Sequence, residues 1–377
     1  MKILVIVPGY PSDNSISYQF VHDRLKEYIK KFNLDVFCYN KKFKLQYEYE
    51  GINVYGGNRR KLMKKIKERD YNCVVFHFMT IRNALIISKH LSEQKVLVWF
   101  HGTDCLGWRR RLSSINYSRK KIINPIFCLK LLRFVIFNKI KLFCIKKVNQ
   151  KNNNVNFVFV SKWLFRASQK DLGINFKNYV IIPNYINMNI FKYQKKTTHQ
   201  RLNVLSISNY VNDLYGGDMI QKIIIKFSTK KEFKYFNFTI YGDGLLFNKY
   251  TENLKKFNNV CINKGFLTKN QIPGLHDNNG ILLYPKRGDS QGVSRCEAMA
   301  SGLVPLALDV EAVSEFSPKD TSYLVKTTED FINALLRVYY NPQEFLLKSK
   351  MSNEYIRKKC SYDNTIKKEI ELLMTKN

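Results

Sequence analysis

At 377 residues, the chain exceeds one ordinary hydrophobic core and suits two domains of about 150–200 residues each. Hydrophobic residues make up 45% of it and aromatic residues 14%, enough for packed globular domains, and the absence of any uncharged apolar run of about 18 residues excludes a membrane-spanning helix. The 63 Lys and Arg against 30 Asp and Glu give a net charge of +33, which favours anionic partners such as nucleic acid, acidic lipid surfaces or phosphate-bearing substrates.

The N-terminal half alternates short apolar runs with segments of helical spacing. The first run, ILVIV at 3–7, is too short for a signal peptide and predicts a buried strand. Further strands are expected at 34–40, 52–56, 73–78, 95–102, 157–161 and 180–187, and helices at 20–32, 58–69 and 82–92. Strands that alternate with helices indicate βαβ units and a parallel sheet.

A basic stretch at 105–170 interrupts this pattern. It contains sixteen Lys or Arg and no Asp or Glu. Within it, residues 123–147 interleave Phe, Leu and Ile with Lys and Arg near the helical period, which predicts a helix with an apolar face and a basic face. Such a helix suits an anionic membrane surface, although a solvated basic face or a helix pair packed on the domain would also explain it. The Lys-rich codon usage of an AT-rich genome would explain part of the overall charge, but not its location.

The polar, aperiodic segment 191–203 is the predicted linker between the two halves. A second series of strands follows at 204–208, 236–244, 260–266, 280–285, 303–308 and 322–326, with helices at about 217–227, 246–257, 269–277, 292–301, 328–340 and 343–375. We therefore expect an N-terminal Rossmann-like domain at 1–190 and a C-terminal one at 204–345. Residues 346–377 are expected to cross back to the first domain.

Ligands of open parallel sheets bind at the carboxyl ends of strands, where residues 284–302 are the richest segment. Lys286 and Arg287 supply positive charge, Gly292 allows close approach of a ligand, and the following helix offers free N–H groups to a diphosphate. Glu297, one to two turns into that helix, could accept hydrogen bonds from a ribose diol. A plain strand–turn–helix with a solvated loop is the alternative.

This segment resembles the signature of the family 4 retaining glycosyltransferases, in which two acidic residues eight apart bracket a glycine-containing loop. Asp289 and Glu297 have that spacing, and Glu297-Ala-Met-Ala-Ser-Gly-Leu-Val-Pro305 fits the motif that follows. The family usually has Glu at the first position. Asp289-Ser-Gln-Gly-Val-Ser resembles a subgroup associated with surface polysaccharide assembly. The resemblance implies a GT-B architecture, two Rossmann-like domains with parallel sheets facing across a cleft, and a hexosyltransferase.

Weaker resemblances run along most of the chain. Val158–Trp163 and Ile182–Tyr185 resemble segments of the family's first domain, and the Phe100-His101-Gly102 strand end places His101 near the transfer point. The resemblance implies His101, Asp289 and Glu297 as catalytic residues. The residues it implies for binding the sugar nucleotide are Gly242, Gly244, Lys286, Arg287, Gln291, Gly292, Val293 and Glu297.

Two departures from the family pattern stand out. Asn209 and Tyr215 occupy the positions where the family usually has Arg and Lys to hold the donor diphosphate, so Lys286 and Arg287 are expected to meet that charge. The N-terminal loop is also poorer in glycine than usual, with Ser15 and Ser17 in its place.

No metal or other cofactor is expected, because the chain has no Asp-x-Asp pair of the kind that metal-dependent transferases use. Nor do the eight cysteines form a C-x-x-C or zinc pattern, which favours reduced thiols in a cytoplasmic protein. The expected partners are a nucleoside-diphosphate sugar, a lipid-linked or glycan acceptor, and an anionic membrane surface that residues 105–170 contact from the cytoplasm. A binding-only relative, a two-domain epimerase and a nucleic-acid-binding protein remain alternatives, the last without a recognisable motif.

Overall fold

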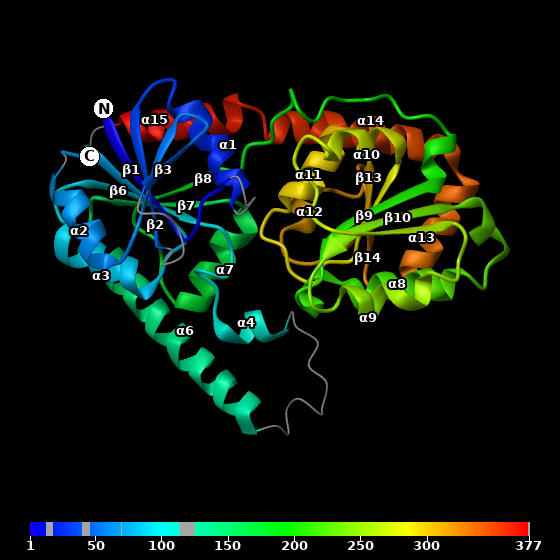
Figure 1. Cartoon of the computed structure of the whole chain (residues 1–377), viewed down its shortest axis with the longest axis horizontal. Helices are drawn as coiled ribbons and strands as arrows, with labels where there is room; N and C mark the ends of the chain where they lie inside the picture. The colour runs from blue at the N-terminus through cyan, green and yellow to red at the C-terminus, as the bar shows by residue number, and fades with distance from the viewer. Residues whose placement is uncertain (13–17, 40–45, 69, 114–124, 376–377) are drawn as a thin grey trace. The chain divides into compact units, whose positions relative to one another are not determined.

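The computed structural model describes residues 1–12, 18–39, 46–68, 70–113 and 125–375 (Figure 1). Ser15, Ser17 and part of the basic stretch lie outside the described residues. The described residues form two compact units, one of residues 1–185 with 362–377 and one of residues 186–361. The segment 191–203, which the sequence pattern predicts as a linker, therefore belongs to the second unit.

The first unit is built on an eight-stranded sheet in the order β3-β4-β2-β1-β5-β6-β7-β8. Neighbouring strands are parallel except β3, which runs antiparallel to β4 and was not predicted from the sequence. The strands are β1 (Lys2–Val7), β2 (Asn33–Cys38), β3 (Gln46–Tyr49), β4 (Ile52–Gly56), β5 (Cys73–His77), β6 (Lys95–Phe100), β7 (Val155–Phe159) and β8 (Tyr179–Ile181).

Helices cover both faces of this sheet, as Figure 1 shows. Alternate side chains of β1 point to opposite faces: Leu4 and Ile6 join the core beneath α2, α3, α6 and α7, whereas Ile3, Val5 and Val7 join the core beneath α1 and the C-terminal helix α15. The helices of this unit are α1 (Gln19–Tyr28), α2 (Arg59–Glu68), α3 (Ile81–His90), α4 (Trp108–Ser113), α6 (Pro125–Lys151), α7 (Lys162–Leu172) and α15 (Lys368–Met374).

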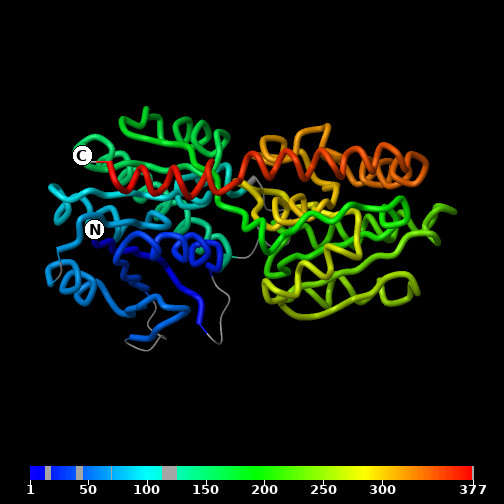
Figure 2. Tube along the Cα trace, turned by 90° about the horizontal axis from the view of Figure 1, so that it is seen from above, coloured from blue at the N-terminus to red at the C-terminus, as the bar shows by residue number. Residues whose placement is uncertain are grey.

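The C-terminal segment is not the single helix that the sequence pattern predicts for 343–375. Helix α14 (Pro342–Lys359) ends at Cys360, and the chain resumes with a π-helical turn at Asp363–Lys367 and then α15. Figure 2 shows this last segment, in red, returning to the unit that holds the N-terminus. There the buried carboxylate of Glu369 pairs with Arg24 at 2.9 Å and accepts a hydrogen bond from Tyr28 at 2.6 Å. The break lets α14 and α15 pack in different units.

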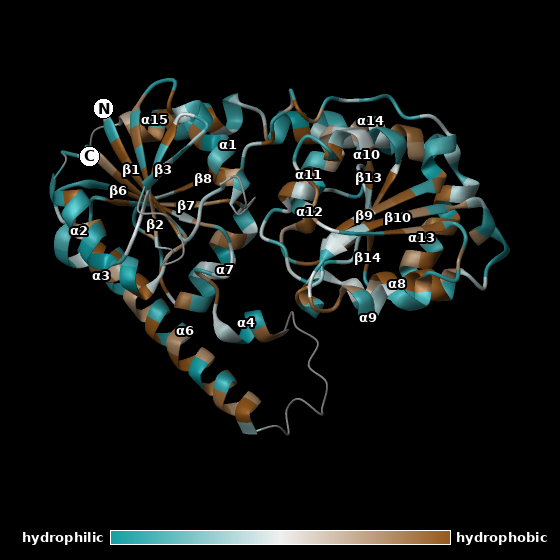
Figure 3. Ribbon diagram, in the orientation of Figure 1, coloured by the Kyte–Doolittle hydropathy of each residue, from teal (hydrophilic) through white to brown (hydrophobic). Residues whose placement is uncertain are grey.

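The sequence pattern predicts that helix α6 has one apolar face and one basic face, and this prediction is wrong. Ile145 and Val148 are buried against the unit, but the side chains of Leu129, Leu132 and other apolar residues point to solvent between exposed lysines and arginines. Figure 3 accordingly shows brown and teal mixed along the whole helix. Among the described helices, none is both long and apolar enough to cross a membrane.

The second unit contains a six-stranded parallel sheet in the order β11-β10-β9-β12-β13-β14. Its strands are β9 (Asn203–Asn209), β10 (Asn237–Asp243), β11 (Val260–Lys264), β12 (Ile281–Tyr284), β13 (Val304–Leu308) and β14 (Tyr323–Val325). Its α-helices are α8 (Gly217–Phe227), α9 (Phe247–Thr251), α10 (Ile272–Asn278), α11 (Val293–Ala300), α12 (Val313–Phe316), α13 (Thr328–Tyr340) and α14.

The same alternation builds two cores in this unit. Ile281 and Leu283 of β12 face the core shared with α8 and α13, whereas Leu282 and Tyr284 face the one shared with α11 and α12. Buried on both faces, β12 and β13 read as continuous apolar runs, which is why the sequence located them well.

Candidate functional site

The second sheet changes direction between β9 and β12. From β9 the chain proceeds outward through β10 and β11, and it then returns to place β12 on the other side of β9. At such a switch point the loops after the two central strands diverge and leave room for a ligand. The loops concerned follow Asn209 of β9 and Tyr284 of β12, and the second one is the β12–α11 loop, residues 285–292.

These two loops are tied together at the backbone. The N–H of Arg287 donates to the carbonyl of Leu214 at 2.9 Å, and within the first loop the hydroxyl of Ser208, at the end of β9, donates to the carbonyl of Tyr215 at 3.1 Å. Gly216 has a φ of 76°, and a β-carbon there would lie 2.2 Å from the carbonyl oxygen of Pro285. A glycine is therefore required where the loops meet.

Asp289 is the electrostatic centre of the β12–α11 loop. Its buried carboxylate accepts a hydrogen bond from the hydroxyl of Tyr284 at 3.0 Å. The amine of Lys286 lies 3.7 Å from one carboxylate oxygen, and the guanidinium of the fully buried Arg295 lies 3.6 Å from the other. Burial, and then the charge of Asp289, raise the pKa of Tyr284 to about 12, so this phenol stays protonated as the donor. Asp289 thus organises the loop whatever else it contacts.

The two cations predicted to bind the donor diphosphate have different surroundings. The guanidinium of Arg287 forms two hydrogen bonds of 2.7 Å with the carboxylate of Asp218, at the start of α8, and also donates to the carbonyl of Asp213. Its charge is therefore balanced within the fold. Nothing in the sequence pattern pointed to Asp218.

Lys286 is the more weakly paired cation. Its amine lies 5.5 Å from the centre of the Tyr215 ring and 6.0 Å from that of Tyr284. Burial is the largest influence on the pKa of Lys286 and would lower it, but the charge of Asp289 together with Tyr284 and Tyr215 outweighs burial and the pKa rises, so the amine is positive at neutral pH. Tyr215, at the position where a family lysine is expected, thus supports a lysine from the neighbouring strand. Asn209, the other departure, accepts a hydrogen bond from the N–H of Val211 at 3.0 Å and forms a turn.

Helix α11 begins directly after Gly292. This glycine has a φ of 79°, and a β-carbon on it would lie 2.3 Å from a carboxylate oxygen of Asp289. It offers no side-chain cap to the helix, so the first N–H groups from Val293 onward form the unpaired, positive helix end that suits an anion. The buried Gln291 fixes the approach to this end, since its carbonyl accepts a hydrogen bond from Arg295 at 2.7 Å.

Glu297 lies on the second turn of α11, with 13% of its side chain exposed. The amine of Lys269 lies 4.0 Å from its carboxylate and also 5.7 Å from the ring of Phe191. Lys269 was missed by the sequence reasoning, because it precedes a short helix and belongs to no motif.

The glycines after β10 have a packing role. A β-carbon on Gly242 would lie 2.1 Å from the carbonyl oxygen of Ser208, and one on Gly244, whose φ is 137°, would lie 2.5 Å from the backbone of Tyr210. The buried Tyr210 ring fills the space that Gly242 leaves. These glycines therefore let the ends of β9 and β10 approach each other beside the β12–α11 loop.

His101 belongs to the first unit, directly after β6. Its Nε2 lies 2.9 Å from Nδ1 of His77, and its ring packs against Phe20 and Phe78. Burial, followed by the charge of Arg24, lowers the pKa of His101 well below its usual value, so the imidazole is neutral at pH 7. The carboxylate of Asp104 accepts the backbone N–H of His101 at 3.1 Å and holds the residue at the strand end.

Comparison with known proteins places the site in a family. Residues 202–341 match the family model described as glycosyl transferases, group 1, and no curated protein sequence matches the chain. Solved structures resemble it over nearly its whole length. They include sucrose-phosphate synthase from Thermosynechococcus elongatus, at 12% identity and a TM-score of 0.72 over 98% of both chains.

Two further structures show the same fold. WaaG, described as a glycosyltransferase involved in lipopolysaccharide biosynthesis, has 10% identity and a TM-score of 0.72 over 99% of this chain and 100% of its own. HepE of Anabaena, solved with UDP and glucose, has 14% identity and a TM-score of 0.67 over 99% of both chains. The matched segment runs from the start of β9 to the end of α13 and includes every residue of the β12–α11 loop. Residues 202–341 thus match the group 1 glycosyltransferase family, and the chain has the GT-B fold of solved glycosyltransferases such as WaaG.

Proposed function

We propose that this glycosyltransferase moves a hexose from a nucleoside-diphosphate sugar to a hydroxyl of a lipid-linked glycan, with retention of configuration, in the assembly of a surface polysaccharide such as a capsule or O-antigen. It acts from the cytoplasm as a peripheral protein on the inner face of the membrane. One observation carries the proposal: Lys286 and Gly292 both adjoin Asp289 where the second sheet switches direction, and Glu297 lies on the helix that begins after Gly292.

The donor diphosphate binds at the start of α11. The bond between the anomeric carbon and the diphosphate oxygen breaks during transfer, so negative charge grows on the leaving group. The protonated Lys286 and the unpaired N–H groups after Gly292 are positioned to stabilise that charge. Arg287 contributes indirectly, because its pairing with Asp218 holds the start of α8 against the loop.

Glu297 and Asp289 bind the two sugars of the donor, which are the ribose of the nucleoside and the sugar that is transferred. Glu297 accepts hydrogen bonds from the ribose diol, and the amine of Lys269 lies 4.0 Å from its carboxylate. Asp289 contacts the transferred sugar while Tyr284 and Lys286 hold its carboxylate in place. The acceptor oxygen bonds to the anomeric carbon, and its proton passes to the departing diphosphate. This scheme needs neither a metal ion nor the paired carboxylates of a glycosidase.

The acceptor binds to the first unit, where neutral His101 helps to orient it at the end of β6. One structural neighbour supports the pathway: WaaG is described as acting in lipopolysaccharide biosynthesis. Another, HepE, was solved with UDP and glucose, so UDP-glucose is the first donor to test here.

Helix α6 supports the membrane part of the proposal. At 1.5 Å per residue its 27 residues extend about 40 Å. Leu129, Leu132, Ile136, Ile140 and Phe143 follow one another at intervals of three or four residues, and each is 43–71% exposed. Residues 125–151 include seven Lys or Arg and no Asp or Glu. Exposed apolar side chains interspersed with cations match an anionic bilayer surface, whereas a second copy of the same helix would be repelled.

A thermal-shift screen of UDP, GDP and ADP sugars on the full chain tests the donor proposal. A ligand at a hundred times its Kd stabilises the folded state by about 2.7 kcal/mol, which raises Tm measurably. We expect one nucleotide series to do this, and radiolabelled sugar from that donor to appear in a lipid-extractable product. If no sugar nucleotide raises Tm, the donor site is misassigned.

A further inference from the structure

The first unit contains a cavity of about 660 Å³ at the carboxyl ends of its central strands. Pro8 follows β1, Tyr39 follows β2, Phe78 follows β5 and Thr103 follows β6, and all four line it. The sheet switches direction between β1 and β5, so this cavity occupies the same topological place in its sheet as the β12–α11 loop does in the other. Its volume lies in the range of small-molecule sites.

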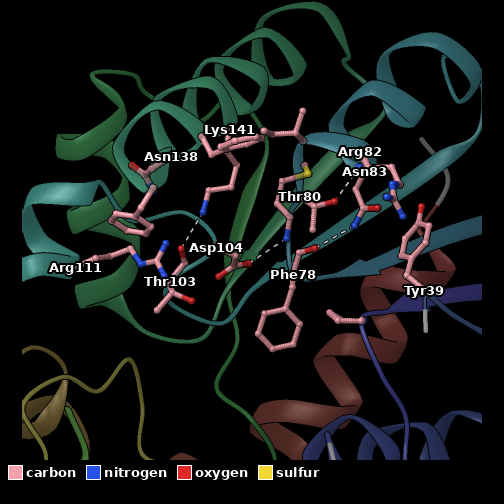
Figure 4. Close-up of a pocket in the computed structure, with 15 residues that line it drawn as sticks. Tyr39, Phe78, Thr80, Arg82, Asn83, Thr103, Asp104, Arg111, Asn138 and Lys141 are labelled. Atoms are coloured by element: carbon pink, nitrogen blue, oxygen red, sulfur yellow. Dashed lines mark hydrogen bonds between the residues drawn. The ribbon is translucent and has the colours of Figure 1, made fainter. Parts of the chain in front are cut away.

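Three cations line this cavity, as Figure 4 shows. The guanidinium of Arg82 lies 5.0 Å from the centre of the Tyr39 ring, and that of Arg111 lies 4.6 Å from the Phe134 ring. The amine of Lys141 donates to the carbonyl of Thr103 at 2.9 Å. Within the described part of the chain, no carboxylate forms an ion pair with Arg82.

Asp104 is the acidic residue that lines the cavity, and its carboxylate is hydrogen-bonded to backbone N–H groups. Its carboxylate accepts the N–H groups of Met79 at 3.2 Å, His101 at 3.1 Å and Gly102 at 2.9 Å, which ties the loop after β5 to the loop after β6. The three cations therefore leave an excess of positive charge in a partly enclosed space, where an anionic ligand would be held more strongly than at an open surface.

The wall contributed by α6 is aromatic. Phe134 and Phe137 come from this helix, and Phe137 is 50% exposed, so it lines the cavity and also adjoins the exposed apolar residues of α6. The cavity thus combines planar guanidinium groups, which bind phosphate through paired hydrogen bonds, with an apolar wall that leads outward along α6.

We propose that this cavity binds the phosphate or diphosphate group of the acceptor, held by Arg82, Arg111 and Lys141, while the apolar part of the acceptor lies along Phe134 and Phe137. The inference rests on the proposed function, because it names the class of acceptor that the transferase would use. It also gives the three cations, which no family motif includes, a common role.

Binding of decyl diphosphate to the full chain tests this proposal, with UDP present in excess to occupy the donor site. The probes for comparison are inorganic pyrophosphate and decanol, and the alkyl compounds are kept below their critical micelle concentrations. The variants are the double change Arg82→Gln with Arg111→Gln, and Lys141→Gln alone. Lys139→Gln is the matched control, since Lys139 is exposed on the same helix and does not line the cavity.

We expect the Kd of decyl diphosphate to rise about tenfold for each cation removed and to stay unchanged in the Lys139 variant. Tighter binding of decyl diphosphate than of pyrophosphate would identify a lipid-linked acceptor, and equal binding a water-soluble phosphorylated glycan. Equal binding of decanol and decyl diphosphate, or an unchanged Kd in folded cavity variants, would overturn the proposal.

Donor binding separates this inference from the proposed function. The cavity variants should retain the Tm increase caused by the sugar nucleotide, because the donor loop belongs to the other unit. If the unmodified chain shows no donor-induced Tm increase but binds decyl diphosphate through the three cations, the proposed function fails and the anion site stands.

Discussion

The amine of Lys286 lies 3.7 Å from the carboxylate of Asp289 and faces the ring of Tyr215, which comes from the loop after the neighbouring strand. Tyr215, which stands where the family usually has Lys, thereby helps to position Lys286. This relationship separates the roles of Lys286 and Arg287, adjacent residues of the same charge.

Replacing Lys286 and Arg287 separately should give opposite phenotypes. Lys286→Gln should lower sugar-transfer activity at least tenfold with little change in Tm, because the lost charge faces the donor site. Arg287→Gln should lower the free energy of unfolding by about 3 kcal/mol, since it removes both 2.7 Å hydrogen bonds of the largely buried Asp218 and leaves that carboxylate only the amine of Lys222, at 3.8 Å. Thermal melts and transfer assays on both variants distinguish these effects. Equal loss of activity at unchanged stability would contradict the division of roles.

Glu297→Ala should abolish the Tm increase caused by the sugar nucleotide while the chain remains folded. The side chain is partly exposed and has Lys269 as a neighbour at 4.0 Å, so its removal should cost little stability. Glu329→Ala is a suitable control, because that carboxylate is exposed on α13 of the same unit. Donor binding at full strength in the Glu297 variant would show that the ribose is held elsewhere.

Gly292→Ala should impair both stability and activity. The substitution forces a non-glycine residue to a φ of 79° and brings its β-carbon to 2.3 Å from Asp289, at an expected cost of about 1–3 kcal/mol. Gly274→Ala provides the matched control. A β-carbon on Gly274, which lies in α10, would meet no atom within 4 Å, so alanine should be neutral or stabilise the helix by about 0.5–1 kcal/mol. Melting curves of both variants test the comparison.

Neutralising Lys130, Arg133 and Lys147 to Gln should weaken binding to anionic vesicles. Each charge near such a surface contributes about 1 kcal/mol, and added salt should weaken binding in the unmodified chain. Flotation with phosphatidylserine-containing and purely zwitterionic vesicles measures the effect. Lys249, Lys255 and Lys256, exposed in the second unit, serve as the control set. Unchanged flotation of the α6 variant would remove α6 as the membrane contact.

Acid should destabilise the second unit partly through His276. Burial, and then the charge of Lys196, lower the pKa of His276 to about 3, and its Nδ1 lies 3.0 Å from the hydroxyl of Ser301. The unfolded chain takes up this proton near pH 6.5, whereas the folded chain resists it. The free energy of unfolding should therefore fall by about 1.4 kcal/mol per pH unit below that point from this residue. His276→Asn should flatten the decline in Tm between pH 6.5 and 5, and an identical decline would exclude His276 as its source.

Sequence periodicity located most strands because they are buried on both faces and therefore read as apolar runs. It failed for β3, whose alternating Gln46–Tyr49 pattern is short and half exposed, and for the C-terminal segment, where helical spacing continues across the break at Cys360. The position of α6 was predicted correctly, but the orientation of its apolar side chains was not. The spacing of apolar residues along a helix does not show which of them remain exposed.

The composition and the motif from Asp289 to Pro305 by themselves determined two α/β halves and the segment that carries the candidate donor site, since strand ends and helix starts have local signatures. Tertiary structure alone decided which charges are available there. Asp218, Lys269 and Tyr215 are remote in sequence from the β12–α11 loop, yet they neutralise Arg287, accompany Glu297 and support Lys286. Coulomb interactions depend on distances in space, and the order of strands in the sheet sets those distances.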